Sequence, residues 1–493
     1  MTVLARPPAP TRPGTTRPEP IRPEAPPAPP EVLALLATVG AGESVPLVGG
    51  RRARYVHLDL AASTPALVRV ADHVTEVLPS YASVHRGAGY LSQLCTGLYE
   101  QARATVGRFV GARPDDVVVF TRNTTDALNL LSTAVPGEVV VLDVEHHANL
   151  LPWRSASSAY AARVVRSAAT LAQTEAALAA ELVRRPAALL AVTGASNVTG
   201  EVPDLRRLVR LAHAHGARVV VDAAQQLPHR GFDLAASDAD YVAFSGHKVY
   251  APFGAGALVG RRDWLDAAEP HLAGGGAVRE VTTTTATWAS SPERHEAGTP
   301  NLLGALALAE ALRTLGAVGL EQVRSHEAAL HRRLVDGLRQ RGIEPLRIWP
   351  DAADVVGVVS FTVRGYAPAQ VAAYLSAEHG IGVRDGRFCA HPLLDRLGVA
   401  EGAVRASLGV GSSSADVDRL LEALDALLTD GPRWTYASDG ASCRPSPDDR
   451  EVPAWAARAG LDALSTTGTP CEPVPSSPTS STPTSSTPAG ADR

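Results

Sequence analysis

Short apolar runs alternate with amphipathic stretches along the middle of the chain. Seven of these runs consist mainly of valine, leucine and alanine, and they occupy residues 116–120, 138–143, 162–165, 188–192, 217–222, 240–244 and 256–260. Strands that are apolar on both sides are typical of a parallel sheet covered by helices on both faces. The runs therefore predict an α/β fold with a mostly parallel, seven-stranded sheet.

Helical spacing of apolar residues appears between the runs, for example in 171–185 and 204–216. A longer helical stretch, 301–341, leads to a second group of elements that predicts a smaller α+β domain. Its expected strands lie near 355–363, 381–384 and 404–410, and its expected helices cover 368–380 and 414–428.

The two ends of the chain differ from this core in composition. Residues 1–30 are rich in proline interspersed with arginine, and the end of the chain is rich in serine, threonine and proline. Such segments cannot bury a core, which predicts disorder. We expect a disordered tail at 1–30, a large domain at 31–300, a small domain at 301–432 and a second disordered tail at 433–493. Residues 31–50 are candidates for packing on the small domain.

Charge and cysteine use limit the partners. The formal net charge is −5, which gives no reason to expect nucleic acid or an anionic membrane as a partner. No apolar run is long enough to cross a bilayer, and the N-terminus lacks a hydrophobic signal core. Cys95, Cys389, Cys443 and Cys471 show no metal-ligand spacing and are too few for a disulfide framework. We therefore expect a cytoplasmic protein without a metal site.

Lysine is almost absent from the chain. Of the 46 basic residues, only Lys248 is a lysine. A lone lysine suggests a task that arginine cannot perform, such as forming a Schiff base, because a lysine amine can lose its proton and attack a carbonyl. The count alone leaves the chance survival of one surface lysine equally open.

Polar residues follow five of the predicted strands. Ligands collect at the carboxyl ends of the strands in open α/β sheets. The residues at these positions are Thr124 and Thr125, His146 and His147, Asn197, Asp222 and Gln225, and Ser245, His247 and Lys248. Thr124 and Thr125 open a helix and suit a phosphate, and a carboxylate at Asp222 would keep a pyridine nitrogen protonated. Each position alone has an ordinary structural explanation, but their order on successive strands indicates a cofactor site.

These segments resemble those of a known family. The matching segments are HLDLAAS, SVHRG, TRNTTDALNL, EHHAN, SNVTG, VDAAQ, FSGHK, EAGTPN, RDGRFCAHPL and VRASLG. They are similar, in order and spacing, to the class V aminotransferase family, and specifically to its group II cysteine desulfurase and selenocysteine lyase branch. The resemblance implies the aminotransferase fold (fold type I), pyridoxal 5′-phosphate (PLP) as cofactor, and a homodimer.

The resemblance also implies roles for single residues. Lys248 would form the Schiff base with PLP and move the substrate's α-proton. His147 would stack on the pyridine ring, Asp222 would pair with the ring nitrogen, and Gln225 would contact the phenolic oxygen. The phosphate ligands would be Thr124, Thr125, Ser245 and His247, joined by Thr299 of the neighbouring subunit.

The substrate would be L-cysteine or a related sulfur or selenium amino acid. Asn197 and Arg405 would bind its carboxylate, since the arginine fork suits bidentate binding, and Arg384 also belongs to the substrate site. Cys389 matches the nucleophile of the desulfurases. Its thiolate would attack the substrate sulfur and give an enzyme persulfide and alanine, with Arg384 and Arg387 helping to lower the thiol pKa. An inert small residue in a loop is the alternative for Cys389.

The chain departs from the family pattern at two places. Arg387 and Phe388 precede the cysteine where polar residues, often histidine, are usual, and the phosphate segment has RNTT where glycine commonly precedes the threonines. Three interpretations stay open. The first is a cysteine desulfurase that passes sulfur to an acceptor protein. The second is another PLP reaction, such as selenocysteine lyase, C–S β-lyase, epimerase or aminotransferase, and the third is a non-catalytic scaffold.

Overall fold

The computed structural model describes residues 30–154, 162–438, 442–461 and 469–470. The chain divides into two units, Met1–Glu31 and Val32–Arg493, and the helices and strands of the described residues lie in the second. The predicted tail at 1–30, except for its last residue, and the end of the chain from residue 471 lie outside the described residues.

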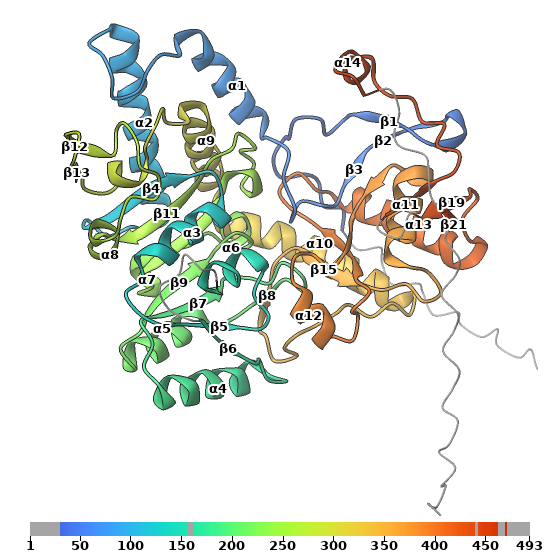
Figure 1. Cartoon of the computed structure of the whole chain (residues 1–493). Helices are drawn as coiled ribbons and strands as arrows, with labels where there is room; N and C mark the ends of the chain where they lie inside the picture. Colours follow the sequence, from blue (N-terminus) through green and yellow to red (C-terminus); the bar gives the residue numbers. More distant parts are fainter. Residues whose placement is uncertain (1–29, 155–161, 439–441, 462–468, 471–493) are drawn as a thin grey trace, which may run out of the picture. The chain divides into compact units, whose positions relative to one another are not determined.

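A seven-stranded sheet forms the centre of the large domain and confirms the predicted fold class (Figure 1). Each predicted run becomes one strand: β4 (Asp116–Thr121), β5 (Val139–Leu142), β6 (Ala162–Val165), β7 (Leu189–Thr193), β9 (Arg218–Asp222), β10 (Tyr241–Ser245) and β11 (Gly256–Arg261). The strand order is β4-β11-β10-β9-β7-β5-β6. Within this sheet β11 runs antiparallel to both neighbours, and the remaining pairs are parallel.

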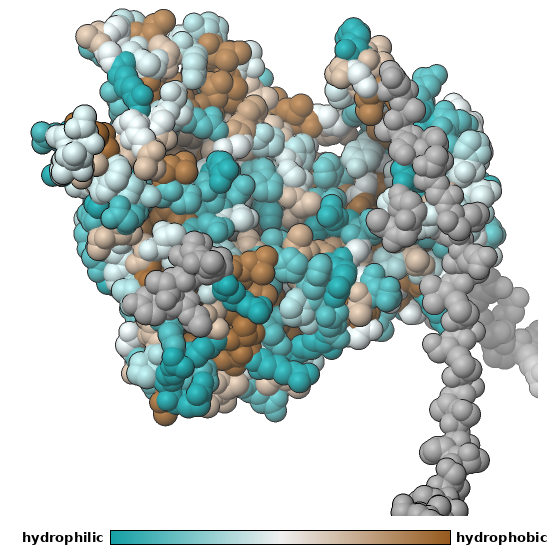
Figure 2. Space-filling view, in the orientation of Figure 1, coloured by the Kyte–Doolittle hydropathy of each residue, from teal (hydrophilic) through white to brown (hydrophobic). Residues whose placement is uncertain are grey.

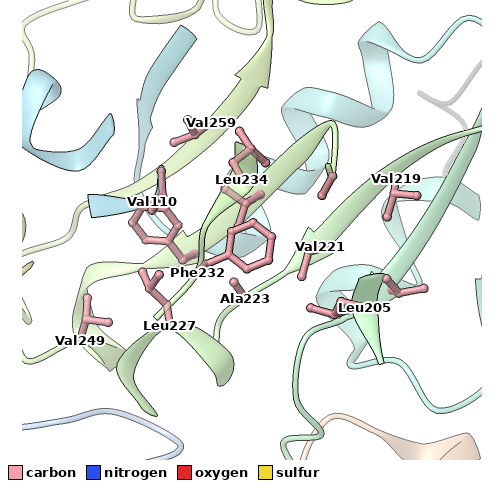
Figure 3. Packing of buried hydrophobic residues seen from close by; sticks show 14 of the residues in the cluster. Val110, Leu205, Val219, Val221, Ala223, Leu227, Phe232, Leu234, Val249 and Val259 are labelled. Carbon is pink, nitrogen blue, oxygen red and sulfur yellow. The ribbon is translucent and has the colours of Figure 1, made fainter. Parts of the chain in front are cut away.

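Both faces of the sheet are buried, which explains why its strands are apolar throughout. In β9, Val219 and Val221 belong to one cluster of buried side chains, whereas Val220 between them belongs to the cluster on the opposite face. The first cluster also contains Phe232 and Leu234 (Figure 3). Successive side chains of a strand point to opposite faces, so a strand between two helical layers needs apolar residues at every position.

The elements around the sheet follow the predicted alternation. The helices that precede the bend at Gly319 are α1 (Val68–Val77), α2 (Tyr90–Phe109), α3 (Thr124–Ala134), α4 (Leu171–Arg184), α5 (Leu205–Ala214), α6 (Gln226–Arg230), α7 (Leu234–Ser237), α8 (Arg262–Ala267) and α9 (Leu302–Val318). A hairpin of β12 (Val278–Val281) and β13 (Ala286–Trp288) lies between α8 and α9.

The small domain has a three-stranded antiparallel sheet of β15 (Val358–Phe361), β18 (Ala403–Ser407) and β17 (Arg384–Gly386). Its helices are α10 (Leu320–Gln340), α11 (Pro368–His379), α12 (His391–Arg396) and α13 (Ser414–Asp430). The N-terminal part of the described chain contributes to this domain. Val48 and Val56 are buried in the same cluster as small-domain residues, and β3 (Val56–His57) pairs with β16 (Ile381–Gly382).

The predicted helical stretch 301–341 is interrupted. The helices α9 and α10 meet at Gly319, where φ is +92°, and the chain bends by 81° between them. Glycine adopts such a φ without the steric penalty of a Cβ atom, so Gly319 ends the first helix. No single helix in the described part of the chain is long and apolar enough to cross a membrane, although α9 and α10 together meet the length and composition criteria.

Hydrophilic and hydrophobic residues are mixed on the face seen in Figure 2.

Elements continue into the segment predicted as a tail from residue 433. They are β19 (Tyr436–Ser438), β20 (Cys443–Pro445), α14 (Ala454–Arg458) and β21 (Thr469–Pro470). The hydroxyl of Tyr436 donates to Glu378 Oε1 of α11 over 2.8 Å, and Tyr436 is buried with small-domain residues. Cys443 is disulfide-bonded. Trp434 and Cys443 are partly buried against the same cluster, so a few residues of this segment pack on the small domain although its composition resembles that of a tail.

Candidate active site

A cavity of about 280 Å³ lies at the carboxyl ends of the central strands. Of the residues given a role from the sequence, His147, Thr299 and Arg387 do not line it. The others do: Thr124, Thr125, Asn197, Asp222, Gln225, Ser245, His247, Lys248, Arg384, Cys389 and Arg405. Most of them come from the large domain, whereas Arg384, Cys389 and Arg405 come from the small domain. The sequence therefore predicted most of the wall of one cavity.

Lys248 lies in the tight turn that follows β10. The turn needs Gly246, because a Cβ atom at that position would approach the Ala255 carbonyl oxygen to 2.6 Å. Burial lowers the pKa of Lys248, and the negative charge of Asp222 only partly opposes this effect. A lowered pKa increases the fraction of neutral amine, which is the nucleophilic form.

Asp222 and Gln225 lie at the end of β9. Asp222 is 4% exposed, its Oδ1 accepts a hydrogen bond from the Ala224 N–H over 3.0 Å, and burial raises its pKa. Gln225 Nε2 donates to the Ala61 carbonyl oxygen over 2.7 Å, while its Oε1 is buried without a partner among the described residues. An unpaired buried polar atom costs about 1–3 kcal/mol. Such an atom in a cavity wall is consistent with a polar ligand that completes the site.

The N-terminus of α3 forms another part of the wall. The Thr124 N–H donates to Ser245 Oγ over 2.8 Å, and the two side-chain oxygens are 2.7 Å apart. Asn123 caps the helix by accepting a hydrogen bond from the Asp126 N–H. A helix N-terminus presents backbone N–H groups and a positive dipole end, which together with these hydroxyls suits a phosphate.

The histidine pair after β5 is arranged differently from the prediction. His146, rather than His147, lines the cavity. His146 Nδ1 accepts a hydrogen bond from the Ala148 N–H over 3.0 Å, and burial lowers the pKa of His146 to about 3, so this side chain is neutral at pH 7. The His147 ring instead packs edge-on against the ring of His391, with their centroids 4.6 Å apart.

Arg405 and Asn197 form the end of the cavity next to the small domain. Arg405 Nη1 donates to the Asn197 carbonyl oxygen and Nη2 donates to Asp59 Oδ1, each over 3.0 Å. Arg405 Nε is buried without a partner among the described residues. The guanidinium is 4% exposed in total, and burial lowers its pKa. A buried guanidinium with one unpaired N–H has capacity for an anionic ligand.

Cys389 lies in a turn between β17 and α12. Phe388 and Cys389 both have positive φ, +51° and +53°, which is uncommon for residues other than glycine. The Ala390 N–H donates to the Arg387 carbonyl oxygen over 2.9 Å, and the His147 N–H donates to the Cys389 carbonyl oxygen over 2.8 Å. The turn leaves Cys389 exposed at the cavity. Residues held in such a conformation are frequent at functional sites.

Thr299 is exposed and lies outside the cavity of its own chain. Several residues that line the cavity were not predicted from the sequence, among them Ala61, Asn123, Thr193 and Phe388. Ala61 and Asn123 lie within the quoted motifs, and His146 was named as a polar residue after a strand without a specific role. No group of three or more histidine, cysteine, aspartate or glutamate side chains in the described part of the chain could hold a metal ion.

The fold and the site together define an α/β protein in which a lysine of lowered pKa, a buried aspartate and the N-terminus of α3 line one cavity. The chain belongs to the aminotransferase class-V family, whose model matches residues 56–420. The elements β19, β20, α14 and β21 lie beyond the matched residues.

Several relatives carry one functional name. The chain is 36% identical over 378 residues to a cysteine desulfurase of Dickeya dadantii. The aligned region covers 75% of this chain and 90% of that protein. It is 36% identical over 385 residues to a cysteine desulfurase of Haloferax volcanii, covering 75% of this chain and 89% of that protein.

Solved structures give the same result. The apo structure of a cysteine desulfurase from Thermococcus onnurineus is similar with a TM-score of 0.71 and 33% identity, covering 76% of this chain and 94% of that one. The cysteine desulfurase CsdA (S-sulfonic acid) of Escherichia coli is similar with a TM-score of 0.68 and 35% identity, with the same two coverages.

Proposed function

We propose that this chain is a PLP-dependent cysteine desulfurase that takes sulfur from L-cysteine and leaves a persulfide on Cys389, with alanine as the second product. The observation that carries the proposal is that Lys248, Arg405 and the exposed Cys389 line the same cavity. The family and the names of the relatives support the same activity.

The side chains in the cavity fit PLP. Lys248 would hold the cofactor covalently through its amine, and Asp222 would pair with the ring nitrogen. Gln225, whose buried Oε1 has no partner among the described residues, would contact the phenolic oxygen. The phosphate would be held by Thr124, Thr125, Ser245 and His247. When bound, PLP supplies an electron sink that makes the substrate's Cα–H acidic.

We assign the ring-stacking position to His146 instead of His147. His146 lines the cavity and is neutral at pH 7, because burial lowers its pKa to about 3. A neutral imidazole can stack on an aromatic ring without the cost of burying a charge. His147 contributes to the other half of the site, through its backbone N–H and its contact with His391.

Arg405 and Asn197 would bind the carboxylate of L-cysteine, and Arg384 would add positive charge at the mouth of the same subsite. Binding at this end would place the substrate between Lys248 and Cys389. The neutral Lys248 amine, favoured by burial, would accept the α-proton.

The Cys389 thiolate would then attack the substrate sulfur. A sulfur–sulfur bond forms and the bond between the substrate's Cβ and its sulfur breaks, with the electron pair of that bond passing to Cβ. Protonation of Cβ and return of the α-proton from Lys248 to Cα would give alanine. Arg384 lines the cavity together with Cys389, whereas the Arg387 guanidinium is paired with Asp395.

Two further assignments accompany this activity. Thr299 is exposed outside the cavity of its own chain, and in a homodimer it would reach the phosphate site of the neighbouring subunit. The persulfide sulfur would pass to an acceptor protein, and we propose the cytoplasm as the compartment.

The test replaces the nucleophile. Cys389→Ser should abolish sulfide and alanine production from L-cysteine while the absorption of bound PLP stays unchanged, because serine alters one atom that does not hold the cofactor. In wild-type protein, the peptide containing Cys389 should gain the mass of one sulfur atom after L-cysteine is added. Cys95→Ala is the matched control, since Cys95 is free but fully buried. Full activity of Cys389→Ser would instead indicate a β-lyase or another PLP reaction.

A further inference from the structure

Phe388 stands immediately before the nucleophile, at a position where the family commonly carries a polar residue. Its side chain is 5% exposed and lines the cavity, and its φ is +51°. A bulky residue with positive φ is an outlier, and it persists where surrounding contacts hold it in place. The contacts that hold Phe388 come from the two residues to which we assign the substrate carboxylate.

The first contact is made by the side chain. The guanidinium carbon of Arg405 lies 5.1 Å from the centroid of the Phe388 ring, which is within the range of a cation–π interaction. Because Arg405 is 4% exposed, its charge depends on compensation from the protein. Asp59 accepts from Nη2, and the ring face of Phe388 provides a second favourable contact.

The second contact is made by the backbone. Asn197 Nδ2 donates to the Phe388 carbonyl oxygen over 2.8 Å, and this carbonyl belongs to the peptide bond that joins Phe388 to Cys389. Asn197 also accepts from Arg405 through its own carbonyl oxygen. Arg405, Asn197 and Phe388 thus form a closed set of contacts beside the nucleophile. In this set, Arg405 Nε has no partner among the described residues.

We propose that Phe388 is a positioning residue that couples the substrate-carboxylate site to the nucleophile. Its ring orients the guanidinium of Arg405, and its carbonyl ties the peptide of Cys389 to Asn197. Binding of a carboxylate by Arg405 and Asn197 would therefore affect the position of the peptide bond between Phe388 and Cys389, and with it the position of the thiol. The inference rests on the proposed function, because it takes these two residues as the carboxylate ligands.

The first experiment measures steady-state kinetics of the holoenzyme with L-cysteine. Phe388→Leu keeps an apolar side chain but removes the ring, so KM should rise about fivefold. Phe388→Tyr keeps the ring and should stay within about twofold of wild type. Phe232→Leu is the matched control, because Phe232 belongs to the same buried cluster but does not line the cavity. It should leave KM unchanged.

A double-mutant cycle separates positioning from general packing. If the ring acts through Arg405, the rise in KM caused by Phe388→Leu should disappear in an Arg405→Lys background, since lysine has no planar guanidinium for the ring to orient. The same rise in both backgrounds would overturn the coupling, because the ring would then act without Arg405.

The second experiment does not depend on turnover. Holoenzyme without L-cysteine is treated with iodoacetamide, and alkylation of Cys389 is followed by mass spectrometry, with the buried Cys95 as internal reference. Phe388→Leu should speed alkylation several-fold, because the turn loses one of its anchors, and Phe232→Leu should not. Unchanged KM and unchanged alkylation in Phe388→Leu would overturn the proposal.

These readouts distinguish the two ideas. If wild-type protein forms no alanine from L-cysteine but Phe388→Leu still speeds alkylation, the proposed function fails while the link between Phe388 and the thiol stands. If wild-type protein is active and Phe388→Leu matches it in both measurements, only the coupling fails.

Discussion

The two halves of the cavity are built in different ways. In the cofactor half, Asp222 and Ser245 are the last residues of β9 and β10, and Thr124 begins α3 directly after β4. Each side chain is placed by a regular element next to it in the sequence. In the nucleophile half, Phe388 and Cys389 lie in a turn with positive φ, and this turn is held by residues from distant parts of the chain.

Side chains at the ends of buried strands have fixed positions, whereas those in the Cys389 turn can be adjusted by single contacts. Parallel strands buried on both faces have little freedom to move, so the cofactor half is set by the core of the large domain. The Cys389 turn depends on single contacts, such as the one between Asn197 and Phe388, which are 191 residues apart. We therefore expect substitutions in the first half to affect the cofactor, and those in the second to affect the thiol and the substrate.

The largest expected effect is at Lys248. Lys248→Arg keeps the positive charge but cannot present a neutral amine, so activity should fall by at least about a hundredfold and borohydride should no longer fix the cofactor to the protein. In wild-type protein the reduced pyridoxyl group must map to Lys248, the one lysine of the chain. An active Lys248→Arg protein would show that Lys248 is not the group that holds the cofactor. The contrast between a cofactor half and a nucleophile half of the cavity would then lose its basis.

Sequence reasoning was most successful in the cofactor half. The apolar runs predicted all seven strands, and nine of the twenty residues that line the cavity come from the polar positions named after those runs, because the ends of parallel strands share one edge of the sheet. The resemblance assigned the stacking role to His147, whereas the structure lines the cavity with His146 and packs the His147 ring against His391. The two histidines are adjacent in the sequence, so no local pattern indicates which of the two rings faces the cavity.

The nucleophile half could be predicted less completely. Cys389 was found through the motif around it, but the contacts of Phe388 with Asn197 and Arg405 join segments that no local pattern relates. A glycine within a helical pattern indicated the break at Gly319, but the helical periodicity of 301–341 favoured a continuous helical stretch. No local sequence signal indicated β19 and β20, since the composition of their segment is close to that of a tail.

The histidine pair provides the next test, because the two rings lie in different halves. His146→Ala should weaken PLP binding about tenfold and shift the visible absorption of the bound cofactor, since a stacked ring is lost. His147→Ala should leave that spectrum unchanged, because its backbone N–H still donates to the Cys389 carbonyl oxygen. Titration of apoprotein with PLP measures both. A shifted spectrum in His147→Ala alone would return the stacking role to His147.

The smallest expected effect concerns Glu145, which precedes His146 in the sequence. The side chain of Glu145 links two segments of the cofactor half through hydrogen bonds. Glu145 Oε1 accepts from the Thr193 N–H over 3.0 Å and Oε2 accepts from Asn149 Nδ2 over 2.7 Å. Burial raises the pKa of Glu145 from 4.5 to about 8. Between these values the folded protein keeps a proton that the unfolded chain has lost, so stability should fall as the pH rises through this window.

Glu145→Gln should remove this contribution, because glutamine does not titrate. The Tm of wild-type protein should therefore drop relative to that of Glu145→Gln between pH 5 and pH 8, by about 1 °C for each kcal/mol involved in a chain of this length. Differential scanning calorimetry at three pH values measures the slope, and Glu280→Gln is the control because Glu280 is exposed. A parallel pH dependence in wild type and Glu145→Gln would mean that Glu145 is ionised in the folded protein. The cofactor half would then contain a buried negative charge held by the hydrogen bonds from the Thr193 N–H and Asn149 Nδ2, and its rigidity would depend on these bonds as well as on the packing of the strands.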